Sequence, residues 1–382
     1  MPALPAAADV VVIGGGPAGV AAAFAARRHG FSVAVIDRAI PPIDKACGEG
    51  LMPDGVAALR TLGVAIAPDT GAPFRGIRFI DKGRSAEAYF GPSANAAPGL
   101  GMRRTALHRL LVAEAEAAGI AMCWGTRAEG LYADRIWTSA GVIRCRWIVG
   151  ADGLHSRVRQ WAGFAPGRTA LRRVGLRRHY TVRPWTDMVE VHWHSKGQAY
   201  VTPISRDEVC VALVGAPTAP SFADLGLSFP RLARRLADAT AGGPPRGALS
   251  VQATFPAVTR RNVVLIGDAS GSVDAVTGEG LALALRQAGA LGAALAAADM
   301  PAYEAAHRRI CRLPRLMGRL LTTLGAHDTI RGWAIGGLAA SPWLFAKLLA
   351  LHIGGGARSD DVECGLTSPR KAAASMASAL RR

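Results

Sequence analysis

Apolar runs interrupted by glycine dominate the first forty residues. Residues 10–13 are four successive β-branched apolar residues, which is typical of a buried strand, and the alanine-rich stretch from Val20 to Arg28 is typical of a helix. A short glycine-rich turn separates them. A second, largely apolar run over residues 31–36 ends in Asp37. The pattern predicts a strand, a tight turn, a helix and a second strand, which together form a βαβ start.

The turn between strand and helix has the spacing G-x-G-x-x-G, with glycine at positions 14, 16 and 19. The first glycine lets the chain reverse, the second lets a pyrophosphate approach the backbone, and the third lets helix and strand pack closely. A phosphate would then meet free amides and the positive dipole of the helix start. The acid that ends the second strand stands where a ribose-binding carboxylate is expected. The predicted dinucleotide-binding residues are Gly14, Gly16, Pro17, Ala18, Gly19, Asp37 and Arg38.

Two later segments also end an apolar run at glycine and aspartate. In residues 147–159 the run passes through a glycine to Asp152 before a helical pattern begins. In residues 262–281 the run ends at Gly267 and Asp268, and a loop leads to a helix start at Gly280. Both segments predict a strand, an acidic turn and a helix start.

In this order and spacing, the three segments resemble the glutathione-reductase-type flavoproteins, a group that includes aromatic hydroxylases, geranylgeranyl reductases and flavin halogenases. The resemblance covers residues 9 to about 310. It implies FAD rather than NAD, bound extended across a Rossmann-like domain. It further implies that Asp268, preceded by Gly267, accepts from a ribityl hydroxyl and that amides near Gly280 and Leu281 face the pyrimidine end of the flavin. A helix N-terminus there would stabilise the negative charge of a reduced flavin.

The resemblance implies roles for four more residues. Asp152 would brace the FAD side and any nicotinamide path, and a helix-capping role is the alternative. Arg104 would contact FAD from the start of a helix, unless its neighbour Arg103 is the true counterpart. Cys47 and Gly48 lie in a loop that passes over the isoalloxazine in these families and is more similar to the loop of the prenyl reductases. Cys47 would touch the flavin or the substrate, or it would only pack.

The implied fold class is α/β, with a discontinuous FAD domain, an inserted β-sheet substrate domain and a C-terminal helical region. Strand patterns over 188–194, 199–203 and 208–214 predict a sheet that covers the flavin. Slipping the register by one residue exchanges its faces, so the sequence does not fix which face lines the cavity. The predicted pieces are 1–75, 100–165 and 255–300 for the FAD domain, 76–99 and 166–254 for the substrate domain, and 301–382 for the helices.

Polar residues on these strands are the candidates for orienting a substrate or relaying a proton. They are His192, His194 and Tyr200, and Cys47 joins them as a catalytic candidate. A strand histidine is more often structural than catalytic.

Composition excludes other classes. The chain has 382 residues, half of them apolar, and a formal net charge of +17 at pH 7. That charge is mostly arginine spread along the chain without a zinc-finger, RNA-binding or basic-helix motif, which argues against nucleic-acid binding. One denser cluster would meet an anionic headgroup, a phosphopantetheine carrier or a pyridine-nucleotide phosphate, or it forms a solvated strand face. Its members are Arg168, Arg172, Arg173, Arg177, Arg178 and Arg183.

Cysteine spacing and the first residues of the chain set further expectations. None of the six cysteines forms a C-x-x-C pair, so no zinc site, redox dithiol or other metal centre is predicted. Met1 to Ala8 lacks the features of a signal peptide, so a cytoplasmic location is expected.

The last apolar stretch, Trp333 to Ile353, approaches the ~20 residues that span a bilayer. Pro342 in its middle, a glycine pair and Lys347 favour a packed pair of helices instead. Peripheral membrane contact is the alternative, because five arginines lie between positions 308 and 319.

Two reactions are compatible with a bound flavin. In the first, NAD(P)H reduces FAD, oxygen adds to the reduced ring, and a small hydrophobic or aromatic, polyketide-like substrate, free or carrier-bound, is hydroxylated in a dry cavity. In the second, the reduced flavin delivers hydride to a double bond of a lipid. The Cys47-Gly48 loop and the turn at residues 277–280 favour reduction, whereas the short substrate domain favours a compact substrate.

Hydroxylation therefore ranks slightly above double-bond reduction, and a non-catalytic flavoprotein is the third hypothesis. Halogenation is the least favoured reaction because the W-x-W-x-I-P segment of the halogenases is absent; Trp193 stands between histidines instead.

Overall fold

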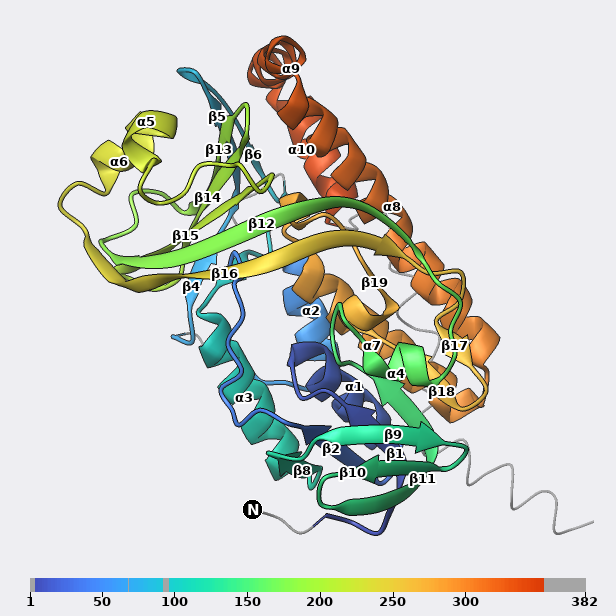
Figure 1. Cartoon of the computed structure of the whole chain (residues 1–382). Helices are drawn as coiled ribbons and strands as arrows, with labels where there is room; N and C mark the ends of the chain where they lie inside the picture. The colour runs from blue at the N-terminus through green and yellow to red at the C-terminus, as the bar shows by residue number, and fades with distance from the viewer. Residues whose placement is uncertain (1–3, 68, 92–95, 354–382) are drawn as a thin grey trace, which may run out of the picture.

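A computed structural model describes residues 4–67, 69–91 and 96–353. Within these residues two eight-stranded sheets and one three-stranded sheet are surrounded by helices (Figure 1). The chain alternates between the two large sheets, so each of them is assembled from segments far apart in the sequence. The predicted α/β class is confirmed.

The first sheet forms around β1 (Ala7–Ile13), in which residues 10–12 are fully buried. β1 pairs in parallel with β2 (Val33–Asp37) on one side and with β11 (Gly141–Gly150) on the other. Central parallel strands are covered on both faces, which explains the unbroken apolar runs. The order is β17-β18-β11-β1-β2-β8, with β9 and β10 added as a hairpin on β11. The other strands are β8 (Ala121–Trp124), β9 (Ala128–Tyr132), β10 (Arg135–Thr138), β17 (Thr259–Arg260) and β18 (Val263–Leu265).

Helices cover this first sheet. α1 (Pro17–Arg28) follows β1, and α7 (Gly280–Ala297) packs against it where Gly292 leaves room: a Cβ there would lie 3.0 Å from the carbonyl oxygen of Ala25. Among the described residues, α7 is the one single helix long and apolar enough to cross a membrane, but 56% of it is buried in this core. The remaining helices here are α2 (Pro53–Thr61), α3 (Arg104–Ala117) and α4 (Arg157–Trp161).

The second sheet lies above the first, and its long strands β12 (Arg168–Thr181) and β16 (Thr240–Thr254) run across the molecule (Figure 1). Its order is β19-β16-β12-β15-β14-β13-β5-β6. β13 (Met188–His194), β14 (Gly197–Pro203) and β15 (Glu208–Gly215) confirm the three predicted strands. The others are β5 (Gly76–Asp81), β6 (Arg84–Tyr89) and β19 (Gly271–Ser272).

The two faces of the second sheet have different coverings. The outer face, which carries Val209 and Val211, packs against α5 (Leu225–Ser228) and α6 (Pro230–Arg235). The inner face carries Trp193, Tyr200 and Cys210, as the strand registers require. It is turned toward the first sheet and the C-terminal helices.

Small elements connect the sheets. A three-stranded sheet of β3 (Gly50–Leu51), β7 (Gly99–Gly101) and β4 (Ala72–Phe74) touches the end of β14, because a Cβ on Gly101 would collide with the Pro203 carbonyl. The loop after β18 contains η1 (Gly267–Ser270), β19 and η2 (Ala275–Thr277). β19 lies in the predicted FAD segment 255–300 but pairs with β16 of the second sheet.

The C-terminal helices are α8 (Met300–Ala326), α9 (Asp328–Ala340) and α10 (Pro342–His352). The predicted helical pair over residues 333–353 is confirmed. Only together are α9 and α10 long and apolar enough to cross a membrane, and a bend of 107° separates them. Phe345 of α10 packs on Phe79 of the inner face, with ring centroids 4.9 Å apart. The remainder of the predicted helical region, residues 354–382, lies outside the described residues.

Candidate active site

The glycine turn has the geometry that a pyrophosphate needs. A Cβ on Gly14, whose φ is +111°, would lie 2.4 Å from the Ala151 oxygen, and one on Gly19 would lie 1.8 Å from the Gly14 oxygen. By contrast, a Cβ on Gly16 would meet nothing within 4 Å. Gly16 precedes Pro17 and Ala18 in the first turn of α1 and offers no capping side chain, so the amides there are free for an anion. The turn therefore fits a dinucleotide phosphate.

The acid after β2 braces this turn. Asp37 accepts from the Gly15 amide at 2.7 Å through Oδ2 and from the Ala39 amide at 2.8 Å through Oδ1. A carboxylate oxygen has two lone pairs, so these contacts leave capacity for a ribose hydroxyl. Arg38 is exposed beside it.

Asp152 has the contacts of a helix cap. Its Oδ2 accepts from the amides of Arg157 and Val158 at the start of α4, at 2.7 and 3.1 Å. Its Oδ1 is buried and has no partner among the described residues. Because an unpaired buried carboxylate oxygen is costly, this atom is available to a ligand.

The third predicted segment also leaves a helix start open. Gly280 begins α7, and a Cβ added to it would meet nothing within 4 Å, so the amides of Gly280 and Leu281 lie at an uncapped N-terminus. Gly267, with φ +60°, donates its amide to Gln287 at 2.9 Å. Asp268 forms a part-exposed ion pair with Lys45 at 2.8 Å, which ties the Cys47 loop to this segment.

The two neighbouring arginines before and at the start of α3 point to different partners. Arg103 pairs with Glu208 on the second sheet. The backbone amide of Arg104 donates to Oε1 of Glu49 at 3.0 Å, and the buried side-chain Nε of Arg104 has no partner among the described residues. Arg104 is thus the residue with a donor free for FAD.

Sequence reasoning missed a buried cluster around Glu49, which stands between Gly48 and Gly50 with φ +60° and is 3% exposed. Its Oε2 lies 2.6 Å from Nε2 of His179, and its Oε1 lies 3.3 Å from Arg177. Holding a non-glycine residue in this left-handed region costs energy and is frequent at functional sites. The signals in the sequence were an acid inside the glycine loop and the arginine cluster of residues 168–183.

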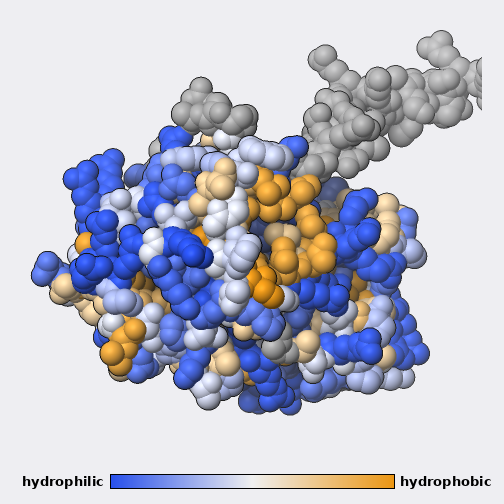
Figure 2. Space-filling model, turned by 90° about the horizontal axis from the view of Figure 1, so that it is seen from above, coloured by the Kyte–Doolittle hydropathy of each residue, from blue (hydrophilic) through white to orange (hydrophobic). Residues whose placement is uncertain are grey.

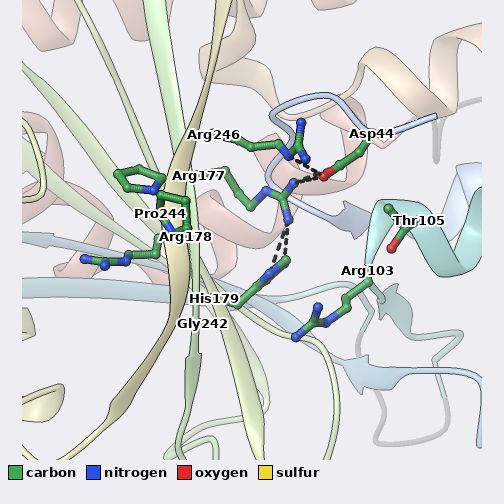
Figure 3. Close-up of a pocket in the computed structure, with 10 residues that line it drawn as sticks. Asp44, Arg103, Thr105, Arg177, Arg178, His179, Gly242, Pro244 and Arg246 are labelled. Atoms are coloured by element: carbon green, nitrogen blue, oxygen red, sulfur yellow. Dashed lines mark hydrogen bonds and ion pairs between the residues drawn. The ribbon is translucent and has the colours of Figure 1, made fainter. Parts of the chain in front are cut away.

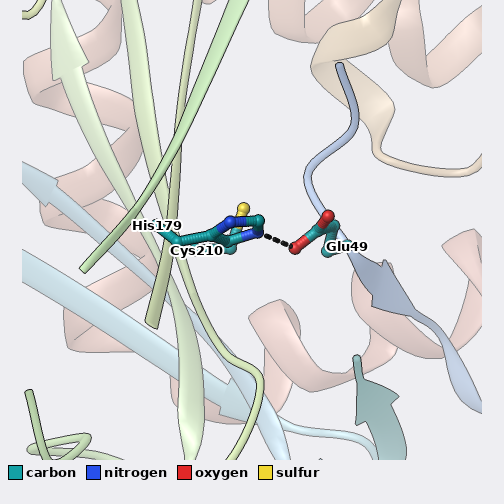
Figure 4. A group of neighbouring side chains, drawn as sticks. All are labelled: Glu49, His179 and Cys210. Atoms are coloured by element: carbon teal, nitrogen blue, oxygen red, sulfur yellow. Dashed lines mark hydrogen bonds and ion pairs between the residues drawn. The ribbon is translucent and has the colours of Figure 1, made fainter. Parts of the chain in front are cut away.

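Cys210 completes a group whose ligand atoms all lie within 4.8 Å of one another: Glu49, His179 and Cys210 (Figure 4). Arg177 contacts both Glu49 and His179, so a guanidinium already neutralises the carboxylate that a cation would need. We therefore interpret the group as a hydrogen-bonded cluster rather than a metal centre.

Cys47 lies at the edge of this cluster. Its sulfur accepts from the Glu49 amide at 3.4 Å, and the Cys210 thiol lies 3.7 Å from the Cys47 carbonyl oxygen. Removal from water raises the pKa of both thiols above the ordinary value of 9.0. The Cys47 thiol is therefore protonated at neutral pH, and its side chain is only half-buried.

A cavity of about 470 Å³ opens beside the cluster, between β12, the first half of β16 and the start of α3 (Figure 3). Asp44 lies between Arg177 and Arg246, 2.8 and 2.7 Å from their nitrogens. Arg177 and Arg173 turn inward, so the six clustered arginines do not form one solvated face. The lining residues are Asp44, Arg103, Thr105, Arg177, Arg178, His179, Gly242, Pro244, Pro245 and Arg246.

The three candidates on the strands do not meet. His192 and His194 lie on the outer face, where His192 contacts Glu190 at 3.1 Å and His194 packs on Phe229. Tyr200 lies on the inner face and donates to the Val276 carbonyl at 2.8 Å, in the turn before Gly280. Only Tyr200 is thus placed on the side of the first sheet.

Glu279, next to the predicted flavin contacts, was not predicted from the sequence. Glu279 precedes the α7 start, and burial together with Asp54 raises its pKa to about 8, although Arg286 opposes the shift. Its Oε2 faces Nδ1 of His352 in α10 at 3.6 Å. The turn that is predicted to approach the flavin thus touches the C-terminal helices.

Known proteins of similar sequence and fold identify the family. Residues 7–214 match the family model described as an FAD binding domain. The menaquinone reductase of Mycolicibacterium smegmatis is 31% identical over 297 residues, covering 72% of this chain and 73% of that protein. The digeranylgeranylglycerophospholipid reductase 1 of Methanopyrus kandleri is 28% identical over 305 residues, covering 72% and 77%. The putative 2-heptyl-3-hydroxy-4(1H)-quinolone synthase AqdB1 of Rhodococcus erythropolis is 30% identical over 288 residues, covering 70% and 74%.

Solved structures share the fold. The flavin-dependent brominase Bmp2 superposes with a TM-score of 0.76 at 18% identity, covering 91% of this chain and 94% of that one. The family match and the relatives establish the FAD-binding domain and an enzymatic role. The chain therefore belongs to the FAD-dependent oxidoreductase superfamily.

Proposed function

We propose that the protein reduces a carbon–carbon double bond of a long-chain apolar substrate, with NAD(P)H as the electron donor. Saturation of such a bond adds a hydride to one carbon and a proton to the other. Reduced FAD supplies the hydride. The chain itself must hold the proton near the substrate, and the buried cluster of Cys47, Glu49 and His179 is the observation that supports this role.

The cluster has the properties of a proton store. A 2.6 Å contact joins the Glu49 carboxylate to Nε2 of His179, and charge-assisted hydrogen bonds of this length are strong. The Glu49 amide orients the protonated sulfur of Cys47. We assign proton donation to the Cys47 Sγ and its reprotonation to the Glu49–His179 pair.

The curated relatives support the same reaction class. Two of the relatives named above are reductases, of menaquinone and of digeranylgeranylglycerophospholipid. Both of these substrates carry long apolar chains. This support and the cluster reverse the slight preference for hydroxylation that the short substrate domain suggested. The arginine-lined cavity offers cationic groups for the phosphates of NAD(P)H.

Hydroxylation is the second candidate function, and the inner face favours it. Phe79 stacks edge-on against Trp193 at 5.6 Å and lies against Phe345, which forms an aromatic wall. An apolar wall of this kind excludes water from an aromatic substrate. The similarity to the putative quinolone synthase also supports this alternative.

One experiment separates the candidates. The FAD-loaded protein is reduced anaerobically with NADPH or NADH and mixed with an unsaturated isoprenoid quinone or with an alkylquinolone, with and without oxygen. The reductase forms, without oxygen, a quinone product that stays heavier by two hydrogen atoms after its ring has been reoxidised in air, because the saturated side-chain bond is not reoxidised. The hydroxylase forms a product heavier by one oxygen atom only with oxygen. Reduction of neither substrate class under any donor would overturn the proposed function.

A variant tests the proton store. We expect Cys47→Ala to lower the rate of product formation by about 10²-fold or more while flavin reduction by NAD(P)H stays unchanged, because general acid catalysis contributes about that factor. The matched control is Cys123→Ala, since Cys123 is a buried cysteine in β8. Equal loss of flavin reduction in Cys47→Ala would contradict the assignment.

A further inference from the structure

The C-terminal helices carry an unusual share of exposed apolar surface. Among the described residues, half of the large hydrophobic side chains that are exposed to solvent lie between positions 316 and 351. Trp333 is 79% exposed and Trp343 is 62% exposed, and they lie on either side of the bend between α9 and α10. The seven residues are Leu316, Leu320, Ile330, Trp333, Trp343, Leu344 and Leu351, which we call the apolar ridge.

The ridge lies at one end of the molecule. In Figure 1, α9 and α10 stand at the top, and the view from above in Figure 2 shows apolar residues gathered in a patch bordered by hydrophilic ones. Scattered single hydrophobic residues are normal on a protein surface, but a contiguous rimmed patch marks a binding surface.

Charge shows which partner fits. Residues 300–353 contain seven Lys and Arg but only two acids. Both acids are engaged: Glu304 binds the amides of 258 and 259, and Asp328 pairs with Arg331 and Lys82. The exposed cations next to the ridge have no acidic partner among the described residues; they are Arg309, Arg312, Arg319 and Lys347.

We propose that the apolar ridge docks this protein on the surface of an anionic lipid bilayer. Exposed tryptophans anchor in the headgroup region, where their rings are amphipathic, and flanking cations bind anionic headgroups. Lys347, whose ammonium lies 5.1 Å from the Trp343 ring, has the geometry of a side chain that extends from an apolar surface to the headgroups.

The opposite sides of the same helices contact the inner face of the second sheet. Ile335 of α9 and Phe345 and Leu349 of α10 are buried there with Trp193. Docking at the ridge would therefore place the lipid against the same helices that cover the inner face of the second sheet. The docking surface follows from exposure and charge alone, so it stands independently of the reaction.

The test uses the full-length, FAD-loaded protein and lipid vesicles. Cosedimentation is measured with vesicles of phosphatidylcholine and with vesicles that also contain phosphatidylglycerol, at low and high salt. We expect binding to the phosphatidylglycerol vesicles that weakens with salt. Each of Trp333→Glu and Trp343→Glu should lower the partition coefficient about tenfold or more, because each removes a large exposed apolar group that docking would bury in the lipid.

Trp137→Glu is the matched control. Trp137 is 41% exposed in β10, on the first sheet and remote from the ridge, so this variant should bind vesicles like the wild type. Flavin content and thermal unfolding confirm that all variants fold. Equal vesicle binding by Trp137→Glu and the ridge variants, or no binding by the wild type, would overturn the proposal.

A second copy of the chain is the competing occupant of the ridge. Light scattering separates the two outcomes, because a wild-type dimer that Trp333→Glu converts to a monomer, without vesicle binding in either state, would also overturn the proposal. Turnover of a detergent-dispersed substrate tests the proposed reaction separately, and the ridge variants should retain it.

Discussion

At the scale of single residues, the three glycines of the phosphate turn have different functions. Gly14 and Gly19 are glycine because protein backbone fills the space of their Cβ atoms. Gly16 is the one of the three whose Cβ position is empty, and its φ of −70° suits any residue. The fold therefore requires glycine at positions 14 and 19, whereas Gly16 is needed only for the predicted approach of an FAD phosphate.

We expect Gly16→Ala to raise the FAD dissociation constant by about tenfold or more, which is ~1.4 kcal/mol, because the new methyl occupies the phosphate site. The unfolding free energy of the apoprotein should stay the same or rise by about 1 kcal/mol. Flavin fluorescence titration and apoprotein melting measure both. Gly289→Ala in α7, whose Cβ also meets nothing within 4 Å, is the control. Unchanged FAD affinity in Gly16→Ala would exclude the phosphate from this position.

Glu279 predicts a pH effect on stability. Its pKa is raised from 4.5 to about 8 in the folded protein, so the folded state holds a proton that the unfolded chain releases above pH 4.5. Its contribution to stability is fully present below pH 4.5 and is lost as the pH rises through about 8. We expect Glu279→Gln to raise the melting temperature at pH 9 and to leave it nearly unchanged at pH 5. An equal change in melting temperature at pH 5 and pH 9 would contradict this expectation.

At the scale of elements, the alternation of side chains along a strand places residues that are close in sequence on opposite faces of the sheet. His192 and Tyr200 are both strand residues of one hairpin, yet they lie on opposite faces of the second sheet. The alternation of apolar residues predicted the strands of this hairpin. Both faces are covered, one by α5 and α6 and the other by the C-terminal helices, so neither has the polar pattern that would identify the inner one.

Tyr200→Phe tests the inner-face assignment. It leaves the Val276 carbonyl without its 2.8 Å donor, which should lower stability by about 1–3 kcal/mol and displace the turn before α7. We expect the KM for substrate or the affinity for FAD to change. His192→Gln, on the outer face, should change neither value. The same steady-state and titration measurements serve both variants, and the opposite ranking would reverse the assignment of the faces.

The Glu49 cluster shows why part of the site could not be predicted. Motif spacing predicted the glycine turn, Asp152 and the α7 start because each is contained within about twenty residues. Glu49 and His179 are 130 positions apart and meet only in the fold. The pairing of β12 with β16 shifts register between Arg177 and His179, so no simple alternation indicates which arginine turns inward.

At the scale of the whole molecule, the two large sheets are joined by a short connection. β18 belongs to the first sheet and β19 to the second, and only residues 266–270 separate them. Beyond β19, Asp274 accepts from Arg173 of β12 at 2.8 Å and from Thr322 of α8 at 3.1 Å. Strands β12 and β16 and helix α8 are therefore all bound to the loop that carries the predicted flavin contacts.

This connection has a mechanical consequence. A motion that separates the two large sheets would have to break the pairing of β19 with β16 and the buried Arg173–Asp274 ion pair in the same step. Because one motion would have to break both contacts, we expect such opening to be rare. The two sheets should therefore move as one rigid unit, and ligand exchange should not require them to separate.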